Sequence, residues 1–374
     1  MDSEIKVDHR VNSGIFVPGD TSICEYLCYL DISSIVKYVE EHHYSDKKWH
    51  YRYDPELMIK LAIIRCFRRL SYEKTILSLT SEECIILNVP EIEDKFNLPS
   101  PKTLHYFVKY RIGEEGFENI MRIIGKMIVE MVDPSNGIVD STPIEASRYD
   151  KYADFNPHYR TKMYKAHIFH YGRYPLYFIF TEGNANDSPL LLPLIEEVKE
   201  MGMQVDSLLL DGGYDSFENH ADIWYHLAAH PYIKPRFGSV LHEEANMDRI
   251  DHWVNKLWKD GGSIHMELNE KLRFLYEHGR EEQVGMYLRD VNLCNPCFDE
   301  TYRKRGDCER THEHIKDIIK FDVRRVSDKS KYLSIYARKF CIVPIVDSDE
   351  SSKWYQTSKS VWSLSIAKCV NFVW

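Results

Sequence analysis

The chain up to about residue 132 places apolar residues at helical spacing. Asp54 and Pro55 form a helix start, since an aspartate caps the helix and proline suits its first turn. The apolar positions that follow are Leu57, Met58, Leu61 and Ile64. Ser100 and Pro101 repeat the start signal, and Leu104, Phe107 and Val108 then face away from Lys102, His105, Lys109 and Arg111. The pattern predicts an all-helical N-terminal domain over 1–132, whose last helix suits DNA contact and an ordinary solvated face equally well.

From Gly137 the apolar positions form short runs that are typical of strands. These runs are 138–141, 166–171, 176–180, 207–210 and 232–234, with Gly172 at the turn between the second and third. Helical patterns cover 190–198, which Asp187 or Ser188 would cap and Gly202 would end, and 217–229. Because the strands first follow one another and then alternate with helices, we expect an α/β fold with a mixed sheet flanked by helices.

Residues 236–300 are mostly helical in pattern and read as an insertion into this α/β domain. Charge is distributed unevenly between this segment and the residues that follow it. Residues 240–300 hold thirteen acidic against seven basic side chains, whereas residues 301–345 hold twelve basic against six acidic ones. The chain's net charge of -10 excludes a uniformly basic nucleic-acid coat, but a local positive groove remains compatible with this distribution.

Composition places the chain among ordinary globular proteins. Its 374 residues are enough for two or three domains, and no apolar run approaches the length needed to span a bilayer. The start, MDSEIKVDHR, lacks the order of a signal peptide, and nine scattered cysteines are most simply reduced thiols. We therefore expect a cytoplasmic protein without a membrane partner.

Two aspartates follow apolar strand runs. Asp140 comes after Ile138 and Val139, and Asp211 comes after the leucines at 208–210. A carboxylate at a strand end is either a turn or helix cap, or a ligand in the crevice beyond the sheet. Asp215 illustrates the first possibility, because Glu218 three residues later makes a capping box and predicts a structural role.

A third carboxylate lies on a helical pattern over 302–316. At 100° per residue, Tyr302, Arg305, Glu309 and Lys316 fall within about 60° of one another. The opposite face carries Cys308, Thr311, Ile315, Ile318 and Ile319. Taken alone, these four residues on one helix face are equally typical of a solvated surface with an Arg305–Glu309 ion pair.

The segments IVDST with Asp140, LLLDGGYDS with Asp211, and YRKRGDCERTHEHIK together resemble insertion-sequence DDE transposases with the Tyr-x2-Arg-x3-Glu-x6-Lys (YREK) signature. The resemblance spans about residues 50–325. It implies an RNase H-like catalytic domain over 133–235 and 301–345, leaving 346–374 as an atypical C-terminal tail. It also implies double-stranded DNA as partner, with terminal inverted repeats and target DNA bound by a homodimer.

The same resemblance implies two Mg²⁺ or Mn²⁺ ions as cofactors. Asp140 would bind both ions, and Asp211 and Glu309 would bind one each. Tyr302, Arg305 and Lys316 would hold phosphates next to the cut. Arg160, Lys162 and Lys165 are further candidates for contact with the DNA backbone, and for each of them charged surface is the alternative.

Several other interpretations remain open. A nuclease of the same fold would cut without strand transfer, and an inactive descendant would only bind DNA. A helical interaction protein would use none of the carboxylates. Cys294, Cys297, Cys308 and His312 have spacing compatible with a structural zinc ion, although Cys308 falls on the apolar face of the 302–316 helix. His167 and His170 lie three apart on a strand and so face opposite sides.

Overall fold

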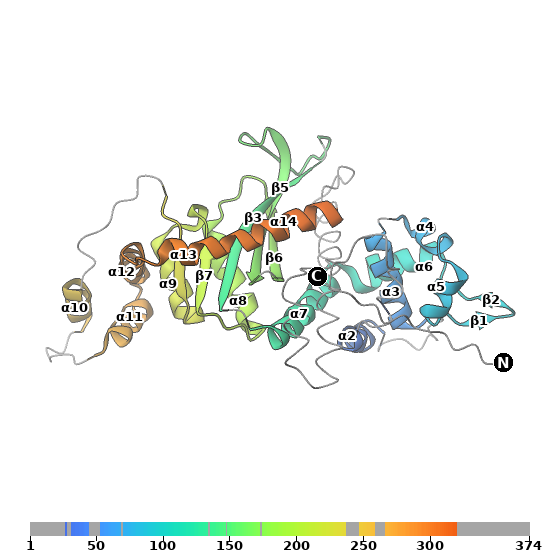
Figure 1. Cartoon of the computed structure of the whole chain (residues 1–374), viewed down its shortest axis with the longest axis horizontal. Helices are drawn as coiled ribbons and strands as arrows, with labels where there is room; N and C mark the ends of the chain where they lie inside the picture. The colour runs from blue at the N-terminus through green and yellow to red at the C-terminus, as the bar shows by residue number, and fades with distance from the viewer. Residues whose placement is uncertain are drawn as a thin grey trace. The chain divides into compact units, whose positions relative to one another are not determined.

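The structure is a computed structural model that describes residues 27, 31–44, 53–68, 70–133, 135–146, 148–172, 174–236, 247–258 and 266–319 (Figure 1). These residues divide into two compact units, whose boundary falls after Phe117 in helix α7 (Gly113–Met131). The four predicted domain boundaries stay predictions. The predicted tail, 346–374, lies outside the described residues.

The first unit contains α2 (Ser33–His43), α3 (Pro55–Phe67), α4 (Tyr72–Leu77), α5 (Ser81–Ile86), α6 (Pro101–Tyr106) and the π-helix η1 (Phe107–Ile112). Both predicted helix starts are confirmed, since Asp54 accepts a hydrogen bond from the Glu56 N–H and Ser100 from the Thr103 N–H. The expectation of an all-helical unit is wrong in one place. Strands β1 (Glu91–Ile92) and β2 (Lys95–Phe96) form a hairpin, because Glu93 and Asp94 adopt the positive φ angles of a tight turn.

The second unit is built on a six-stranded mixed sheet. Its strands are β3 (Asn136–Glu145), β4 (Asp154–Asn156), β5 (Thr161–Tyr171), β6 (Tyr174–Glu182), β7 (Ser207–Leu210) and β8 (His230–Ile233). The order is β4-β5-β3-β7-β8, and β6 also pairs with β5. Strands β3, β7 and β8 run parallel, whereas β5 is antiparallel to its neighbours. Together with its helices, this mixed sheet confirms the predicted α/β class and is consistent with an RNase H-like fold.

Helices α8 (Leu191–Glu200) and α9 (Phe217–Leu227) connect the later strands, as predicted. Gly172 and Gly202 adopt positive φ angles at the turn and helix end expected of them. The predicted cap before α8 is wrong for Asp187: a short 3-10 helix, Ser188–Leu190, comes first, and the Asp187 side chain makes no capping hydrogen bond. The Asp187 carboxylate instead contacts Lys165 and His167.

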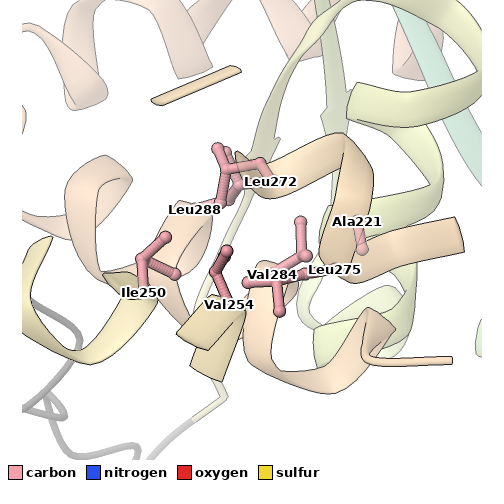
Figure 2. Close-up of a cluster of buried hydrophobic side chains, with 7 residues drawn as sticks. All are labelled: Ala221, Ile250, Val254, Leu272, Leu275, Val284 and Leu288. Atoms are coloured by element: carbon pink, nitrogen blue, oxygen red, sulfur yellow. The ribbon is translucent and has the colours of Figure 1, made fainter. Parts of the chain in front are cut away.

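The segment predicted as a helical insertion contains α10 (Met247–Leu257), α11 (Leu268–Glu277) and α12 (Glu281–Leu293). Figure 2 shows the apolar cluster that joins these helices to α9. Its buried members are Ala221, Ile250, Val254, Leu272, Leu275, Val284 and Leu288. Gly285 lets α12 approach α9 closely, because a Cβ at this position would lie 1.7 Å from the Phe217 carbonyl oxygen. The insertion therefore shares a core with the α/β unit.

The chain then continues through α13 (Phe298–Tyr302), a 3-10 turn (Arg303–Arg305) and α14 (Gly306–Ile319). The expectation of one continuous helix over 302–316 is thus wrong, because the 3-10 turn interrupts it. Cys308 faces the core as expected and packs against Ile138 and Leu209. Figure 1 shows α14 alongside β3. Among the described residues, none of the helices combines the length and apolar character that crossing a membrane requires.

Candidate active site

Asp140 and Asp211 lie side by side on neighbouring parallel strands. Val139 and Leu210 are partners in the β3–β7 ladder; Asp140 follows Val139 within β3, and Asp211 directly follows the last residue of β7. Neighbouring strands are about 4.8 Å apart, so the two carboxylates share one edge of that ladder. The sequence suggested that Asp140 ends its strand. The structure differs, because β3 continues to Glu145 in pairing with β5. The ladder with β7 nevertheless ends there.

Arg305 connects two of the predicted carboxylates. One guanidinium nitrogen donates to Oδ1 of Asp140 at 2.9 Å, and another donates to Oε1 of Glu309 at 3.2 Å. Burial raises the pKa of Asp140, and the positive charge and hydrogen bond of Arg305 oppose this shift. The arginine thus supplies positive charge at a carboxylate that the fold has taken out of water.

A chain of buried polar groups contacts the second oxygen of Asp140. Cys308 Sγ and His312 Nδ1 each lie 3.6 Å from Oδ2, and His312 Nε2 lies 3.0 Å from Nε2 of His170. If the His312 Nδ1–H points toward Asp140, His170 must donate its Nε2–H to His312. That leaves the buried Nδ1 of His170 as a bare acceptor, and this atom indeed has no hydrogen-bond partner among the described residues. The contacts of Cys308 and His312 restrict the orientation of the Asp140 carboxylate.

Asp211 is held by the loop that follows β7. Its Oδ1 accepts a hydrogen bond from the Gly213 N–H at 2.9 Å. Burial raises the pKa of Asp211, and the nearby charge of Asp140 raises it further. A Cβ on Gly213 would lie 2.9 Å from Asp211 Oδ1 and 2.8 Å from Asp187 Oδ2, so a side chain here would have to displace these carboxylates. Asp140 and Asp211 therefore form a region of negative charge, with little free space around Gly213.

Asp187 is a neighbour of the site that the sequence did not predict. It lies 3.0 Å from Lys165 Nζ and 3.3 Å from His167 Nδ1. Its sequence context, Asp-Ser-Pro before an apolar helix, is typical of a cap and gives no sign of this contact. Lys165 and His167 are both on β5, and the pairing of β5 with β3 places His167 opposite Ser141, the residue after Asp140.

Tyr302 also belongs to this site. Burial raises the pKa of its phenol to about 12, Arg305 opposes the shift, and the charges of Asp211 and Asp140 add to it. The ring stacks on Phe298 with centroids 5.6 Å apart. A phenol in this position stays protonated at neutral pH and can donate a hydrogen bond.

Glu309 projects further into solvent than the two aspartates. Its side chain is 65 % exposed and contacts Arg305. Lys316 lies on α14, but its side chain is outside the described residues. In the described part of the chain, no three histidine, cysteine, aspartate or glutamate side chains lie closely enough together to hold a metal ion. The structure thus brings Asp140, Asp211, Arg305 and Tyr302 together and leaves the Glu309 carboxylate at their edge.

The other predicted DNA contacts lie on or before β5. Arg160 is exposed in a turn with φ of 52°. Lys162 donates to the backbone carbonyl of Asp150, and Lys165 donates to the Ala185 carbonyl at 2.9 Å and to Asp187. Their roles in DNA binding stay predictions.

The candidate zinc set is spread over different environments. Cys294 and Cys297 are exposed, whereas Cys308 is buried. His312 is buried against His170. The sequence spacing therefore does not translate into a shared coordination sphere within the described residues.

Asp215 does not form the predicted capping box. Ser216 caps α9 instead, by accepting from the Asn219 N–H. Asp215 contacts His220 and Arg289 at 3.4 and 3.3 Å and accepts from the Arg236 N–H. Those contacts still make it a structural residue.

Comparison with known proteins agrees with the geometry of the two aspartates. The family described as Transposase DDE domain matches residues 133–331, which is more than half of the chain and includes β3, β7 and α14. No curated protein matches the chain. The match begins just before β3 and covers every carboxylate of the candidate site. The chain therefore belongs to the transposase DDE domain family.

Proposed function

We propose that this protein is a DNA transposase that cuts DNA at the ends of a mobile element and transfers the cut strands into target DNA. The observation that carries the proposal is the adjacent placement of Asp140 and Asp211, with Arg305 linking Asp140 to Glu309. Members of the matched family are normally catalytic. We also propose that the spacing of Tyr302, Arg305, Glu309 and Lys316 places the chain in the YREK group.

The proposed cofactors are two Mg²⁺ or Mn²⁺ ions. Asp140 and Asp211 fit this requirement, since burial raises the pKa of both carboxyl groups and the charge of Asp140 raises that of Asp211 further, so bound cations would stabilise the charged carboxylates. Asp140, Asp211 and Glu309 would hold these ions. When bound, such ions would activate the attacking hydroxyl and stabilise the leaving oxygen.

The remaining residues would act on the DNA itself. Arg305 already touches two carboxylates with separate nitrogens, and the same planar group can hold a phosphate through two hydrogen bonds. In that role Arg305 would exchange its contacts with Asp140 and Glu309 for contacts with the phosphate. The protonated phenol of Tyr302 would donate to a phosphate oxygen, and Lys316 would supply a further positive charge.

A strand-transfer assay tests the proposal. Duplexes from the DNA that flanks the coding sequence, precut to expose a 3′-hydroxyl, are incubated with plasmid and Mn²⁺. The wild type and Asp206→Asn, which changes an exposed aspartate ahead of β7, should join the duplex to plasmid, and Asp140→Asn should not.

Two other results would contradict the proposal in different ways. Cleavage without any joined product would instead favour a nuclease of the same fold. DNA binding without activity, unchanged by Asp140→Asn, would favour an inactive descendant.

Joining of both element ends in one complex would further support the proposed homodimer on DNA.

A further inference from the structure

Four exposed aromatic side chains gather in the segment that links β3 to β5. Tyr149, Tyr152, Phe155 and Tyr159 are 70, 61, 56 and 52 % exposed. We call residues 148–160 the aromatic arm. Exposed aromatic rings gathered in this way are unusual on a protein surface and indicate a binding surface. No role in the proposed chemistry uses them.

The aromatic arm is held in place by a buried polar core. Asp150 is fully buried and accepts hydrogen bonds from the N–H groups of Tyr152 and Ala153 and from the hydroxyl of Tyr164. Strand β4 pairs with the first residues of β5, beyond the part of β5 that pairs with β6. The Asn156 side chain donates to the Gly183 carbonyl, and the Asn184 side chain donates to the carbonyl of Phe155 in the arm. The rings are therefore presented on an ordered support.

Positive charge accompanies the rings. Residues 148–162 contain Arg148, Lys151, Arg160 and Lys162 against two carboxylates, and one of these, Asp150, is buried. The guanidinium of Arg148 lies 4.6 Å from the centroid of the Tyr149 ring. Alternation of aromatic rings with cations is the pattern that binds single-stranded nucleic acid, because the rings stack on bases and the cations contact phosphates. On a chain whose net charge is -10, this local excess favours a polyanion.

The arm is connected directly to the proposed site. After Asp140, β3 continues to Glu145, and the arm begins three residues later at Arg148. The five residues of extended strand from Asp140 to Glu145 cover about 17 Å, which corresponds to roughly five nucleotides of a DNA strand. Strand β4 of the arm lies level with Glu145, because Glu145 and Asp154 both pair with Met163. In Figure 1, β5 reaches beyond β6 at the end of the sheet where the arm lies.

We propose that the aromatic arm binds unpaired bases of DNA about five nucleotides from the cut. Base faces are available for stacking only where pairing is lost, whereas a closed duplex offers backbone and groove edges. The proposal rests on the proposed function for its substrate, but it concerns DNA binding and not cleavage.

Fluorescence anisotropy without divalent metal tests the arm separately from catalysis. The probes are a blunt duplex and the same duplex with a five-nucleotide single-stranded end. The wild type should bind the single-stranded end about 10-fold more tightly than the blunt duplex, since stacking of one base supplies about that factor. The combined variant Tyr149→Ala, Tyr152→Ala, Tyr159→Ala should lose this preference and keep its affinity for the blunt duplex. The three Tyr→Phe substitutions should retain the preference, because they keep the rings.

Trp258→Ala provides the control, since it removes an exposed aromatic side chain from the acidic helical segment. It should leave the preference unchanged. Equal preference in the wild type and the triple alanine variant would overturn the proposal, as would equal affinity of the wild type for both probes. A change in oligomeric state without a change in probe preference would identify the arm as a contact between copies of this chain.

Cleavage assays on the same proteins separate the two proposals. Probe preference that depends on the arm, in a wild type that never cuts DNA, would sustain the arm and refute the transposase function. Cleavage by a wild type that shows no preference would refute only the arm.

Discussion

Asp211→Asn should stabilise the protein in the absence of metal ions, because it removes one of two adjacent negative charges. Burial raises the pKa of Asp211 above its ordinary value, and the charge of Asp140 adds to that shift. An acid with a raised pKa in the folded state lowers stability at neutral pH, and this penalty is relieved as the pH falls through the raised pKa. Asparagine keeps the acceptor for the Gly213 N–H without the charge.

The magnitude follows from the strand geometry. Carboxylates on neighbouring strands are about 5 to 6 Å apart, and an effective dielectric constant of about 20 gives a repulsion of roughly 3 kcal/mol. The substitution also removes the attraction of Arg305 for Asp211, and solvent reaches this carboxylate. We expect a net gain of about 1 kcal/mol, or an increase of roughly 2 to 4 °C in Tm for a unit of this size.

Thermal unfolding in EDTA measures the repulsion between the two carboxylates, and thermal unfolding with Mg²⁺ or Mn²⁺ measures the stabilisation by bound metal. In EDTA, Asp211→Asn should melt above the wild type, while Asp206→Asn, an exposed control ahead of the same strand, should match it. Added metal should stabilise the wild type more than Asp211→Asn, since a ligand stabilises in proportion to its affinity for the folded state. A Tm of Asp211→Asn below that of the wild type in EDTA would refute the repulsion between Asp140 and Asp211. Equal stabilisation of both proteins by metal would refute metal binding by Asp211.

Three further substitutions test other parts of the account. Arg305→Lys keeps the charge but loses the two-pronged contacts, and should reduce cleavage at least about 10-fold while leaving the fold intact; unchanged cleavage would show that geometry at this position is irrelevant. His312→Phe should weaken Mn²⁺ binding by about 10- to 100-fold in a titration, because Asp140 loses a group that orients it, and unaltered affinity would remove the histidine from the site. Gly285→Val should lower the free energy of unfolding by more than about 3 kcal/mol in urea, because any side chain there collides with Phe217, and a smaller loss would mean that α12 shifts easily.

The local sequence patterns predicted the elements that carry the two aspartates. The apolar run at 207–210 is β7 as observed, and an aspartate follows it directly. Because β3 and β7 are parallel neighbours, two similar runs that each end in aspartate meet at one edge. This part of the site could be predicted since a short buried strand and the residue after it are adjacent in the sequence.

Features that depend on distant segments could not be predicted in this way. A helical projection treats 302–316 as one regular helix, and nothing in its periodicity reveals the 3-10 turn before Gly306. The contact between His170 and His312 joins residues far apart in the chain. Strand β4 has only three residues, too few for an alternating pattern, so the aromatic arm also escaped prediction.

Mg²⁺-dependent cutting of duplex DNA from the flanks of the coding sequence tests the central claim most directly, with wild type, Glu309→Gln and the exposed control Glu300→Gln compared at equal DNA binding. We expect cleavage by the wild type and by Glu300→Gln, and none by Glu309→Gln. Equal cleavage by all three proteins would contradict it, because the third carboxylate would then have no part in the reaction.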